Sequence, residues 1–235
     1  YSRLNNDLSL PLFNNATQAQ KAPGSTFKPI IAVAALEEGA ISLTETVTCT
    51  GLYQEITPYM RCWIYPGSHG PLDVEHGIMN SCNVFFAEAG DRLSTDENGN
   101  YLPGLGIEKI QKYASMFGLN EASGIEISEK APQMTTEKPE ASSIGQGKNS
   151  YSNVQLARYI TAIANRGDVY KLSLLDKMTD SQGNLIKDFT PEIRSKIDIA
   201  DSTWNVVQSG MRKVISNGSA NRIFRDLEVD IAGKT

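Results

Sequence analysis

The sequence predicts an α+β fold with a mostly helical body and short strands. One observation is a series of segments in which apolar residues recur at helical spacing. Another is a set of shorter segments in which β-branched and polar residues alternate, as they do in strands. The chain has 235 residues, of which 40% are hydrophobic and 21% are charged. It can therefore bury a sizeable core as one domain, or as one domain with a small lobe.

The composition narrows the class of protein. The formal net charge is −5, the pI is near 5.2, and the sequence has no basic stripe or arginine-rich cluster. A nucleic-acid partner is not expected, since nothing would offset the repulsion of the phosphates. No apolar run approaches the roughly 18 to 20 residues that span a bilayer, and no signal peptide is visible. Any export signal or membrane anchor is expected outside this sequence.

Residues 22–36 are the most informative segment, because a serine and a lysine open a helix that is otherwise apolar. A Pro-Gly pair ends whatever precedes the helix, and Ser25 can begin it. Residues 30–36 leave almost no polar face, so the helix is expected to run through the middle of a domain. Ser25 and Lys28 are three positions apart, which places them on one face of the first turn.

That geometry has a chemical use. A serine hydroxyl is a poor nucleophile until a base removes its proton, and a lysine can be that base only if its pKa of about 10.4 is lowered. The positive end of the helix dipole and the packed apolar run behind Lys28 both favour the neutral amine. The alternative is structural, with Ser25 as a helix cap and Lys28 extending from a core helix. That alternative would prevail for an isolated S-x-x-K.

The other elements follow along the chain. Residues 1–24 are expected to be irregular, residues 44–71 to form a loop-rich lobe beside the site, and residues 129–150 to form a polar loop. Ser152 with Gln155 predicts a capping box, and Asp201 is expected to cap the last helix. Helices are predicted at residues 72–80, 83–93, 107–117, 152–164 and 201–215. Strands are predicted at residues 44–50, 124–128 and 229–232, with a hairpin of residues 168–178 and 185–189.

Two further motifs follow Ser25 in the chain. Ser81-Cys82-Asn83 interrupts two predicted helices, and Lys234-Thr235 ends the sequence. On their own, Ser81 and Asn83 are typical helix-break residues, because Ser and Asn both favour caps. The order S-x-x-K, S-x-N and K-T-G is the signature of penicillin-binding proteins and class A β-lactamases.

The match extends beyond these short motifs. Three longer segments resemble the transpeptidase domain of penicillin-binding proteins. They are Pro-Gly-Ser-Thr-Phe-Lys-Pro (23–29), Asn-Ser-Cys-Asn-Val-Phe-Phe (80–86) and Ile-Gly-Gln-Gly (144–147), the last leading into Val-Gln-Leu-Ala (154–157). The resemblance covers nearly the whole chain. It implies a β-lactamase-like fold with a mostly helical body and an incomplete antiparallel sheet. It also implies that residues 1–235 are one transpeptidase domain truncated at both ends, because the glycine after Lys234-Thr235 and some flanking strands of the family are missing. The parent most resembles a monofunctional, class B type.

The resemblance also implies roles for individual residues. Ser25 is similar to the nucleophile that attacks the penultimate D-alanine, and Lys28 to the base that takes its proton. Ser81 is similar to the residue that relays a proton to the leaving group. Substrate binding is implied for Asn83 (a peptide carbonyl) and for Lys234 and Thr235 (the substrate carboxylate).

The implied activity is D,D-transpeptidation of peptidoglycan, with no cofactor. The implied partners are stem peptides ending in D-Ala-D-Ala, β-lactam antibiotics and wall-synthesis proteins. The implied location is the extracytoplasmic face of a bacterial cytoplasmic membrane. Two alternatives remain: a β-lactamase or β-lactam sensor of the same fold, or a catalytically silent scaffold. A class A β-lactamase needs a glutamate for deacylation. Glu129, Glu137 and Glu140 lie in the relevant loop, but without an E-x-x-L-N pattern.

The three cysteines leave several possibilities open. Cys82 is expected to be a small buried hydrophobe inside the S-x-N element. Cys49 and Cys62 flank the lobe, with His69 and Asp73 soon after. They can form a disulfide, form a zinc site with His69 and a carboxylate, or stay unpaired. The ligand spacing is not a strong zinc signature, so no metal is expected. Neither histidine, His69 or His76, lies in a recognisable triad context.

Overall fold

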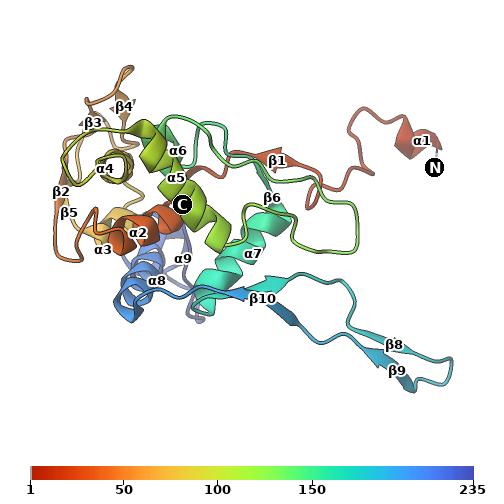
Figure 1. Cartoon of the computed structure of the whole chain (residues 1–235). Coiled ribbons are helices and arrows are strands. Elements are labelled where there is room, and N and C mark those ends of the chain that lie inside the picture. The colour runs from red at the N-terminus through yellow and green to blue at the C-terminus, as the bar shows by residue number, and fades with distance from the viewer. Residues whose placement is uncertain (1) are drawn as a thin grey trace.

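The fold is built around one central helix, α2 (Lys28–Glu37), in the computed structural model, which describes residues 2–235 (Figure 1). All residues of α2 from Lys28 to Ala35 are buried. A helix that is apolar on all sides belongs in the interior, as the sequence predicted. Four helices pack around it: α3 (Val74–Met79), α4 (Asn83–Leu93), α5 (Pro103–Met116) and α8 (Asp201–Ser216).

The remaining helices lie around this core: α1 (Ser2–Asn5), α6 (Pro139–Ser143), α7 (Asn153–Ala164) and α9 (Asn221–Phe224). The predicted capping box of α7 is confirmed. Ser152 donates its backbone N–H to Gln155 Oε1 at 2.9 Å, and its hydroxyl oxygen accepts from the Gln155 backbone N–H at 3.4 Å. Helix α6 approaches α4 closely, because a Cβ at Gly90 would overlap the Ser143 hydroxyl.

The strands form five antiparallel pairs and no larger sheet within residues 2–235. The sheet is therefore as incomplete as the sequence predicted. The pairs are β1 (Gln20–Lys21) with β6 (Tyr151–Ser152), β2 (Val47–Cys49) with β5 (Gly70–Leu72), β3 (Leu52–Tyr53) with β4 (Met60–Arg61), β7 (Asp168–Lys171) with β10 (Glu192–Lys196), and β8 (Lys177–Thr179) with β9 (Leu185–Asp188).

Two strand predictions are wrong. Residues 124–128 form no strand, because Glu126 binds the neighbouring segment through its side chain instead of through a backbone ladder. Its carboxylate accepts from the Leu174 N–H at 2.8 Å and from the Ser173 hydroxyl at 2.5 Å. Residues 229–232 form no strand either, because the chain there lies against α8, where Arg212 donates to the Ile231 carbonyl at 2.9 Å.

Smaller differences concern element ends. Asp201 is the first residue of α8 and not its cap, and its carboxylate pairs with Arg166 at 2.7 Å. Helix α5 begins at Pro103, four residues before the predicted start at Ile107, because proline is favoured at the first helical position. Helix α6 lies inside the region predicted as loop, and β7 and β8 divide the segment predicted as one strand.

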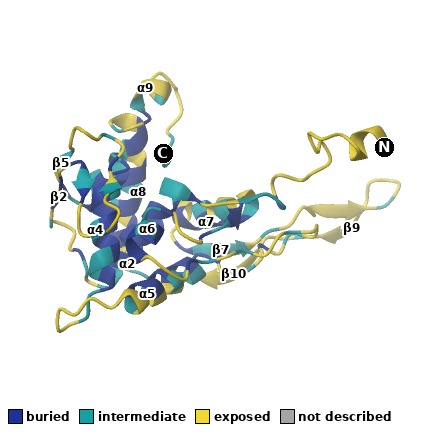
Figure 2. Cartoon of the chain, turned by 90° about the horizontal axis from the view of Figure 1, so that it is seen from above, coloured by how far each residue is buried: buried dark blue, intermediate teal, exposed yellow. Residues whose placement is uncertain are grey.

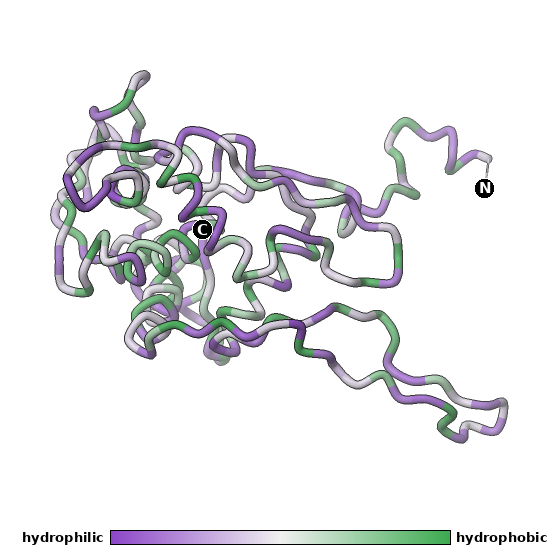
Figure 3. Tube along the Cα trace, in the orientation of Figure 1, coloured by the Kyte–Doolittle hydropathy of each residue, from purple (hydrophilic) through white to green (hydrophobic). Residues whose placement is uncertain are grey.

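Buried residues gather in the helical body, while the β8–β9 hairpin and the N-terminal segment extend away from it and are exposed (Figure 2). Several residues on these arms are nonetheless hydrophobic (Figure 3). Leu8 is 99% exposed, and Leu185 and Ile186 are each 60% exposed. None of the helices in the described part of the chain has both the length and the apolar character that a membrane span requires.

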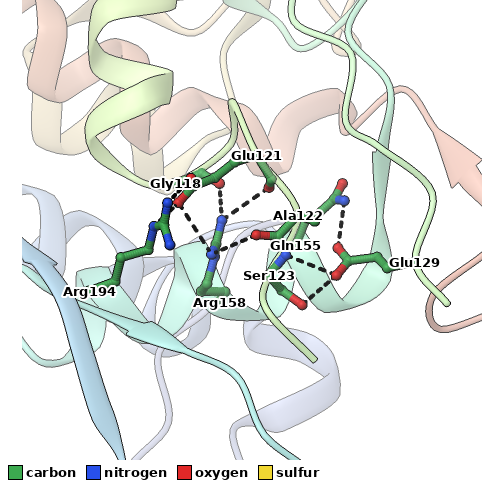
Figure 4. A network of polar contacts seen from close by, with 8 residues as sticks. All are labelled: Gly118, Glu121, Ala122, Ser123, Glu129, Gln155, Arg158 and Arg194. Carbon is green, nitrogen blue, oxygen red and sulfur yellow. Dashed lines mark hydrogen bonds and ion pairs between the residues drawn. The ribbon is translucent and has the colours of Figure 1, made fainter. Parts of the chain in front are cut away.

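A buried arginine fixes α7 to the chain that follows α5 (Figure 4). Arg158, 1% exposed, donates to the carbonyl oxygens of Gly118, Glu121 and Ala122. Hydrogen bonds of this kind offset the cost of burying a guanidinium. Beside it, the Glu129 carboxylate accepts from Gln155 Nε2 at 2.6 Å. This network sets the position of α7, which in turn contacts the segment containing Ser25.

Candidate active site

A tight turn presents Ser25 immediately before the central helix. Gly24–Phe27 form a 3-10 helix, η1, that leads directly into α2. Gly24 has φ +54° and donates its N–H to the Gly145 carbonyl at 3.0 Å. Gly145 has φ +73°, and a Cβ there would overlap the Gly24 carbonyl. Gly145 of the Ile-Gly-Gln-Gly segment is therefore a backbone support for the serine turn, which explains why a glycine stands there.

Lys28 extends from the start of α2 into the break between α3 and α4. It is fully buried, and its ammonium donates to the Ser81 carbonyl at 2.7 Å and to Asn83 Oδ1 at 2.7 Å. The Ser81 hydroxyl oxygen lies 3.4 Å away. Burial lowers the pKa of Lys28 from 10.5 to about 8, and the nearby sulfurs of Cys82 and Cys62 offset part of that effect.

Ser81 lies in the turn between α3 and α4 with φ +50°, an uncommon conformation for a residue with a side chain. Its hydroxyl donates to the Thr235 carbonyl at 2.7 Å, and Lys234 Nζ donates to the same oxygen at 2.7 Å. The C-terminal segment therefore returns to the turn between α3 and α4, with Thr235 itself exposed. Burial, followed by the charge of Lys28, lowers the pKa of Lys234 from 10.5 to about 6.

Ser25 is half-buried, and its hydroxyl makes no hydrogen bond within residues 2–235. It is linked to Lys28 through the backbone, where the Lys28 N–H donates to the Ser25 carbonyl. Sequence reasoning missed Tyr159 of α7, which is fully buried and donates its hydroxyl to the Thr26 carbonyl at 2.7 Å. Nothing in the local pattern separates this tyrosine from an ordinary core residue.

The structure thus brings five of the six predicted site residues into one hydrogen-bonded cluster, and places the sixth, Ser25, on the adjacent turn. The five are Lys28, Ser81, Asn83, Lys234 and Thr235. Such a cluster can accept a proton at a buried amine and pass it along a hydroxyl.

Comparison with protein-family models decides the family. Residues 2–235 match the model described as the penicillin-binding protein transpeptidase domain. The chain belongs to this family. The predicted resemblance and fold are therefore confirmed, and relatives named MrdA and PBP2 are of the class B type that the sequence indicated.

Comparisons with curated proteins and with solved structures agree with this family assignment. The chain is 28% identical over 256 residues to the peptidoglycan D,D-transpeptidase MrdA of Haemophilus influenzae, covering 100% of this chain and 37% of that protein. A chain of a peptidoglycan synthase complex has 28% identity and a TM-score of 0.83, with 100% of this chain and 39% of that one covered. PBP2 of Pseudomonas aeruginosa, solved in complex with WCK 5153, has 24% sequence identity and a TM-score of 0.82. The match covers 100% of this chain and 54% of that one, and at this identity it supports the fold alone. The chain thus spans well under half the length of its curated relative.

The glutamates that could serve a β-lactamase have other partners in this penicillin-binding protein domain. Glu129 accepts from the Ser123 hydroxyl and from Gln155 at 2.6 Å each. Glu140 accepts from the Tyr101 hydroxyl. Glu137 is exposed and lies 3.6 Å from Lys148. His76 is bound to the helix cap Asp73 at 2.7 Å, in a structural role.

The three cysteines are free thiols, and no disulfide joins Cys49 to Cys62 in the described residues. Cys82, which the sequence suggested was only a small core residue, is buried as predicted but also joins them in a cluster with His69. Their ligand atoms all lie within 4.8 Å of one another. No spacing of residues along the chain indicates this cluster, because Cys82 belongs to a different motif.

The cluster has the donors that zinc prefers. His69 Nδ1 lies 3.5 Å from Cys49 Sγ and 3.6 Å from Cys62 Sγ, and Cys62 and Cys82 Sγ are 3.9 Å apart. Ligands about 2.0 to 2.3 Å from a tetrahedral zinc ion are separated by similar distances. The interaction with the Cys82 sulfur lowers the pKa of Cys62 below its usual value and favours a thiolate there. His69 Nε2 is buried without a hydrogen-bond partner in residues 2–235. These residues fit a structural Cys₃His zinc site, whereas the carboxylate considered from the sequence is not part of the cluster.

Proposed function

We propose that this chain carries the active site of a peptidoglycan D,D-transpeptidase, which cross-links stem peptides through an acyl-enzyme on Ser25. The observation that supports this most strongly is the position of Lys28. Its amine is buried one turn after Ser25, between the oxygens of Ser81 and Asn83, with a pKa near 8. An amine with that pKa is neutral in a useful fraction at neutral pH, so it can act as a general base.

The first step forms the acyl-enzyme. Ser25 Oγ forms a bond to the carbonyl carbon of the penultimate D-alanine while Lys28 takes the hydroxyl proton. The peptide bond to the terminal D-alanine breaks, and Ser81 relays the proton held by Lys28 to the departing amine. In the second step the amine of another stem peptide attacks the ester and gives up a proton to Lys28. Lys28 returns that proton to Ser25 Oγ as the ester bond breaks. A β-lactam acylates the same serine by opening its ring.

Three residues would hold the donor peptide. Asn83 would bind the peptide carbonyl before the cleaved bond, while Lys234 and Thr235 would bind the terminal carboxylate. An incoming carboxylate would raise the pKa of Lys234, which burial and Lys28 keep low in the free site. Lys234 would therefore become charged as substrate binds.

The biological setting follows from the relatives. The curated relative is named a peptidoglycan D,D-transpeptidase, and a structural neighbour belongs to a peptidoglycan synthase complex. By analogy, the substrates would be D-Ala-D-Ala stem peptides, and the partners would be other wall-synthesis proteins. The site would act at the extracytoplasmic face of the cytoplasmic membrane, with the anchor elsewhere in the protein.

Labelling with a fluorescent penicillin tests the proposal in the full-length protein. Mass spectrometry is expected to find the adduct on the peptide that contains Ser25, and Lys28→Arg is expected to abolish labelling because a guanidinium cannot act as a base. An adduct on Ser81 would overturn the assignment, and a folded protein that takes no label would be a silent scaffold. An adduct that hydrolyses within seconds would indicate a β-lactamase.

A further inference from the structure

The lobe contacts both ends of the turn between α3 and α4. The Arg61 carbonyl accepts from Asn83 Nδ2 at 3.1 Å, and Trp63, two residues later, donates its indole N–H to the Asn80 carbonyl at 2.8 Å. Asn83 is at the same time an acceptor for the Lys28 ammonium. The position of this part of the lobe is therefore coupled to the position of the turn that holds the Lys28 amine.

Two buried thiols lie together between these hydrogen bonds. Cys62 lies between Arg61 and Trp63, Cys82 lies in the turn, and their sulfurs are 3.9 Å apart. Bonded sulfurs lie about 2.05 Å apart, so a disulfide would bring this pair about 2 Å closer. A cysteine has a single side-chain torsion before its sulfur, so the backbone must supply part of that approach. The flanking hydrogen bonds already hold the two backbones side by side.

The Cys82 sulfur also has a structural role in the turn. Cys82 is the N-cap of α4, and its sulfur accepts from the Phe85 N–H at 3.4 Å. The packing around the turn leaves little free space, because a Cβ at Gly77 would overlap the Phe85 ring. A bond to Cys62 would draw the sulfur away from this N–H, and the start of α4 would lose its cap.

The consequence of such a bond would fall on the Lys28 ammonium. Ser81 and Asn83, on either side of Cys82, supply its two oxygen acceptors at 2.7 Å each. A shift of the turn toward the lobe would move both oxygens relative to the amine. Misplacing a catalytic group by about 1 Å can cost about 10²-fold in rate. A covalent bond at Cys82 is therefore expected to slow acylation of Ser25.

A third thiol offers an alternative bond that would spare the turn. Cys49 at the end of β2 is also buried, and its sulfur lies within 4.8 Å of the sulfurs of Cys62 and Cys82. A Cys49–Cys62 bond would join two residues of the lobe and leave the turn unchanged. His69, the fourth member of this cluster, is only partly buried, so one side of the cluster is open to a small solute. The effect of oxidation therefore depends on which pair of sulfurs is joined.

We propose that Cys62 and Cys82 are a site of reversible oxidation by hydrogen peroxide, and that their disulfide slows acylation of Ser25. One thiol attacks a peroxide oxygen, the O–O bond breaks, and a sulfenic acid and one water form. The second thiol attacks the sulfenic sulfur, the S–S bond forms, and a second water leaves. The two sulfurs together lose the two electrons that the peroxide gains. A thiol reductant returns both electrons by thiol–disulfide exchange.

The slowing of acylation rests on the function proposed above, whereas formation of the bond does not. The bond is therefore measured independently of activity. The full-length protein is treated with hydrogen peroxide, its remaining thiols are alkylated, and it is digested without reduction by a protease that cuts after glutamate. Glu55 and Glu75 separate the three cysteines, so each cysteine lies on its own peptide. Mass spectrometry is expected to find the peptide of Cys62 joined to the peptide of Cys82.

Penicillin labelling of Ser25 measures the consequence of the bond. The labelling rate of the treated protein, relative to the untreated protein, is expected to fall at least about tenfold and to recover with dithiothreitol. A loss that dithiothreitol does not restore would indicate sulfinic acid or methionine sulfoxide and would overturn the proposal. A parent that forms no Cys62–Cys82 bond, or a Cys49–Cys62 bond in its place, would overturn it as well. Failure of penicillin to label the untreated parent would refute the proposed function and the effect on acylation, while the peptide map would still decide the bond.

Cys49→Ser and Cys82→Ser are matched variants, because each removes one of the three thiols. Serine at position 82 keeps an oxygen that can accept from the Phe85 N–H. Each variant is compared with its own untreated rate, so that loss of a metal site does not enter the comparison. Cys49→Ser is expected to lose labelling on oxidation as the parent does, whereas Cys82→Ser is expected to keep it. Equal losses in the two variants would show that oxidation acts elsewhere and would overturn the proposal.

Discussion

The ammonium of Lys28 lies 2.7 Å from Asn83 Oδ1 and 2.7 Å from the carbonyl oxygen of Ser81. Both oxygens are neutral, so they supply hydrogen bonds without a negative charge that would hold the proton on the amine. Burial therefore dominates and lowers the pKa of Lys28 from 10.5 to about 8. The pairing of a buried lysine with an amide, and not with a carboxylate, is what makes the amine available as a base.

The rate of penicillin acylation is expected to rise with pH and to level off above about pH 8. The neutral amine is the base, and its fraction grows as the pH passes the pKa of Lys28, which is about 8 and not 10.5. At pH 7 roughly one amine in ten would be neutral. The initial rate of labelling with a fluorescent penicillin, measured between pH 6 and pH 10, gives this profile. A rate that is flat across that range would exclude Lys28 as the base.

Asn83→Asp tests whether the neutral oxygen of Asn83 is what leaves the pKa of Lys28 low. A carboxylate at the position of Asn83 Oδ1 would favour the charged amine and raise the pKa of Lys28 by about 1 to 3 units. The midpoint of the pH profile is expected to move up by that amount, with about a tenfold lower rate at pH 7 for each unit. Asn205→Asp, on the exposed surface of α8, adds the same charge and serves as the control. An unmoved midpoint in Asn83→Asp would contradict the account.

Tyr159 is expected to position the serine turn without taking part in the chemistry. Tyr159→Phe removes the 2.7 Å hydrogen bond to the Thr26 carbonyl and is expected to cost about 1 kcal/mol in the free energy of unfolding, by urea titration. Acylation is expected to slow severalfold while the midpoint of its pH profile stays near 8. Tyr113→Phe is the matched control, since it removes a buried hydroxyl bond of 3.0 Å to Glu38 away from the turn. Equal slowing in both variants would show that only general stability matters.

The sequence was most informative where local pattern decides the structure. The apolar run after Lys28 predicts a buried helix, and the Ser152–Gln155 pair predicts the start of α7, because helix periodicity and caps depend on neighbouring residues. Residues 124–128 show the opposite case. Their alternation fits a strand, but Glu126 reaches Leu174 through its side chain, so no ladder forms. A strand depends on its partner, which local sequence does not specify.

The candidate site shows the same contrast between residues that local sequence identifies and contacts that depend on distant segments. The order of S-x-x-K, S-x-N and K-T identifies residues that the fold brings into one cluster, since that order belongs to a family. The contact of Tyr159 with Thr26 and the approach of Cys82 to His69 join segments that are far apart in the chain. Neither residue carries a spacing signal, so only the tertiary structure reveals them.

Gly145 is expected to be indispensable to the serine turn. Gly145→Ala would place a Cβ on the Gly24 carbonyl oxygen at a position where φ is +73°, so both overlap and backbone strain oppose it. We expect a loss of more than about 2 kcal/mol in unfolding free energy, together with slower acylation. Gly39→Ala separates the two effects, because Gly39 has φ +66° but nothing within 4 Å of its added Cβ. It is expected to cost only about 1 to 2 kcal/mol and to leave acylation unchanged. Equal costs for the two variants would show that strain alone acts.

Zinc is expected to bind the cluster of Cys49, Cys62, Cys82 and His69 with a stoichiometry near one per chain. Three sulfurs and an imidazole nitrogen within 4.8 Å of one another would repel as thiolates unless a cation joins them. Cys82 lies between Ser81 and Asn83, so the ion would also fix the turn that holds the Lys28 ammonium. Elemental analysis is expected to find zinc, and a strong chelator is expected to lower both the melting temperature and the acylation rate. Cys62→Ser is expected to lose the metal, whereas Ser68→Ala, next to His69, is expected to keep it. Purified protein without zinc, whose melting temperature does not change when zinc is added, would show that the cluster is a set of free thiols.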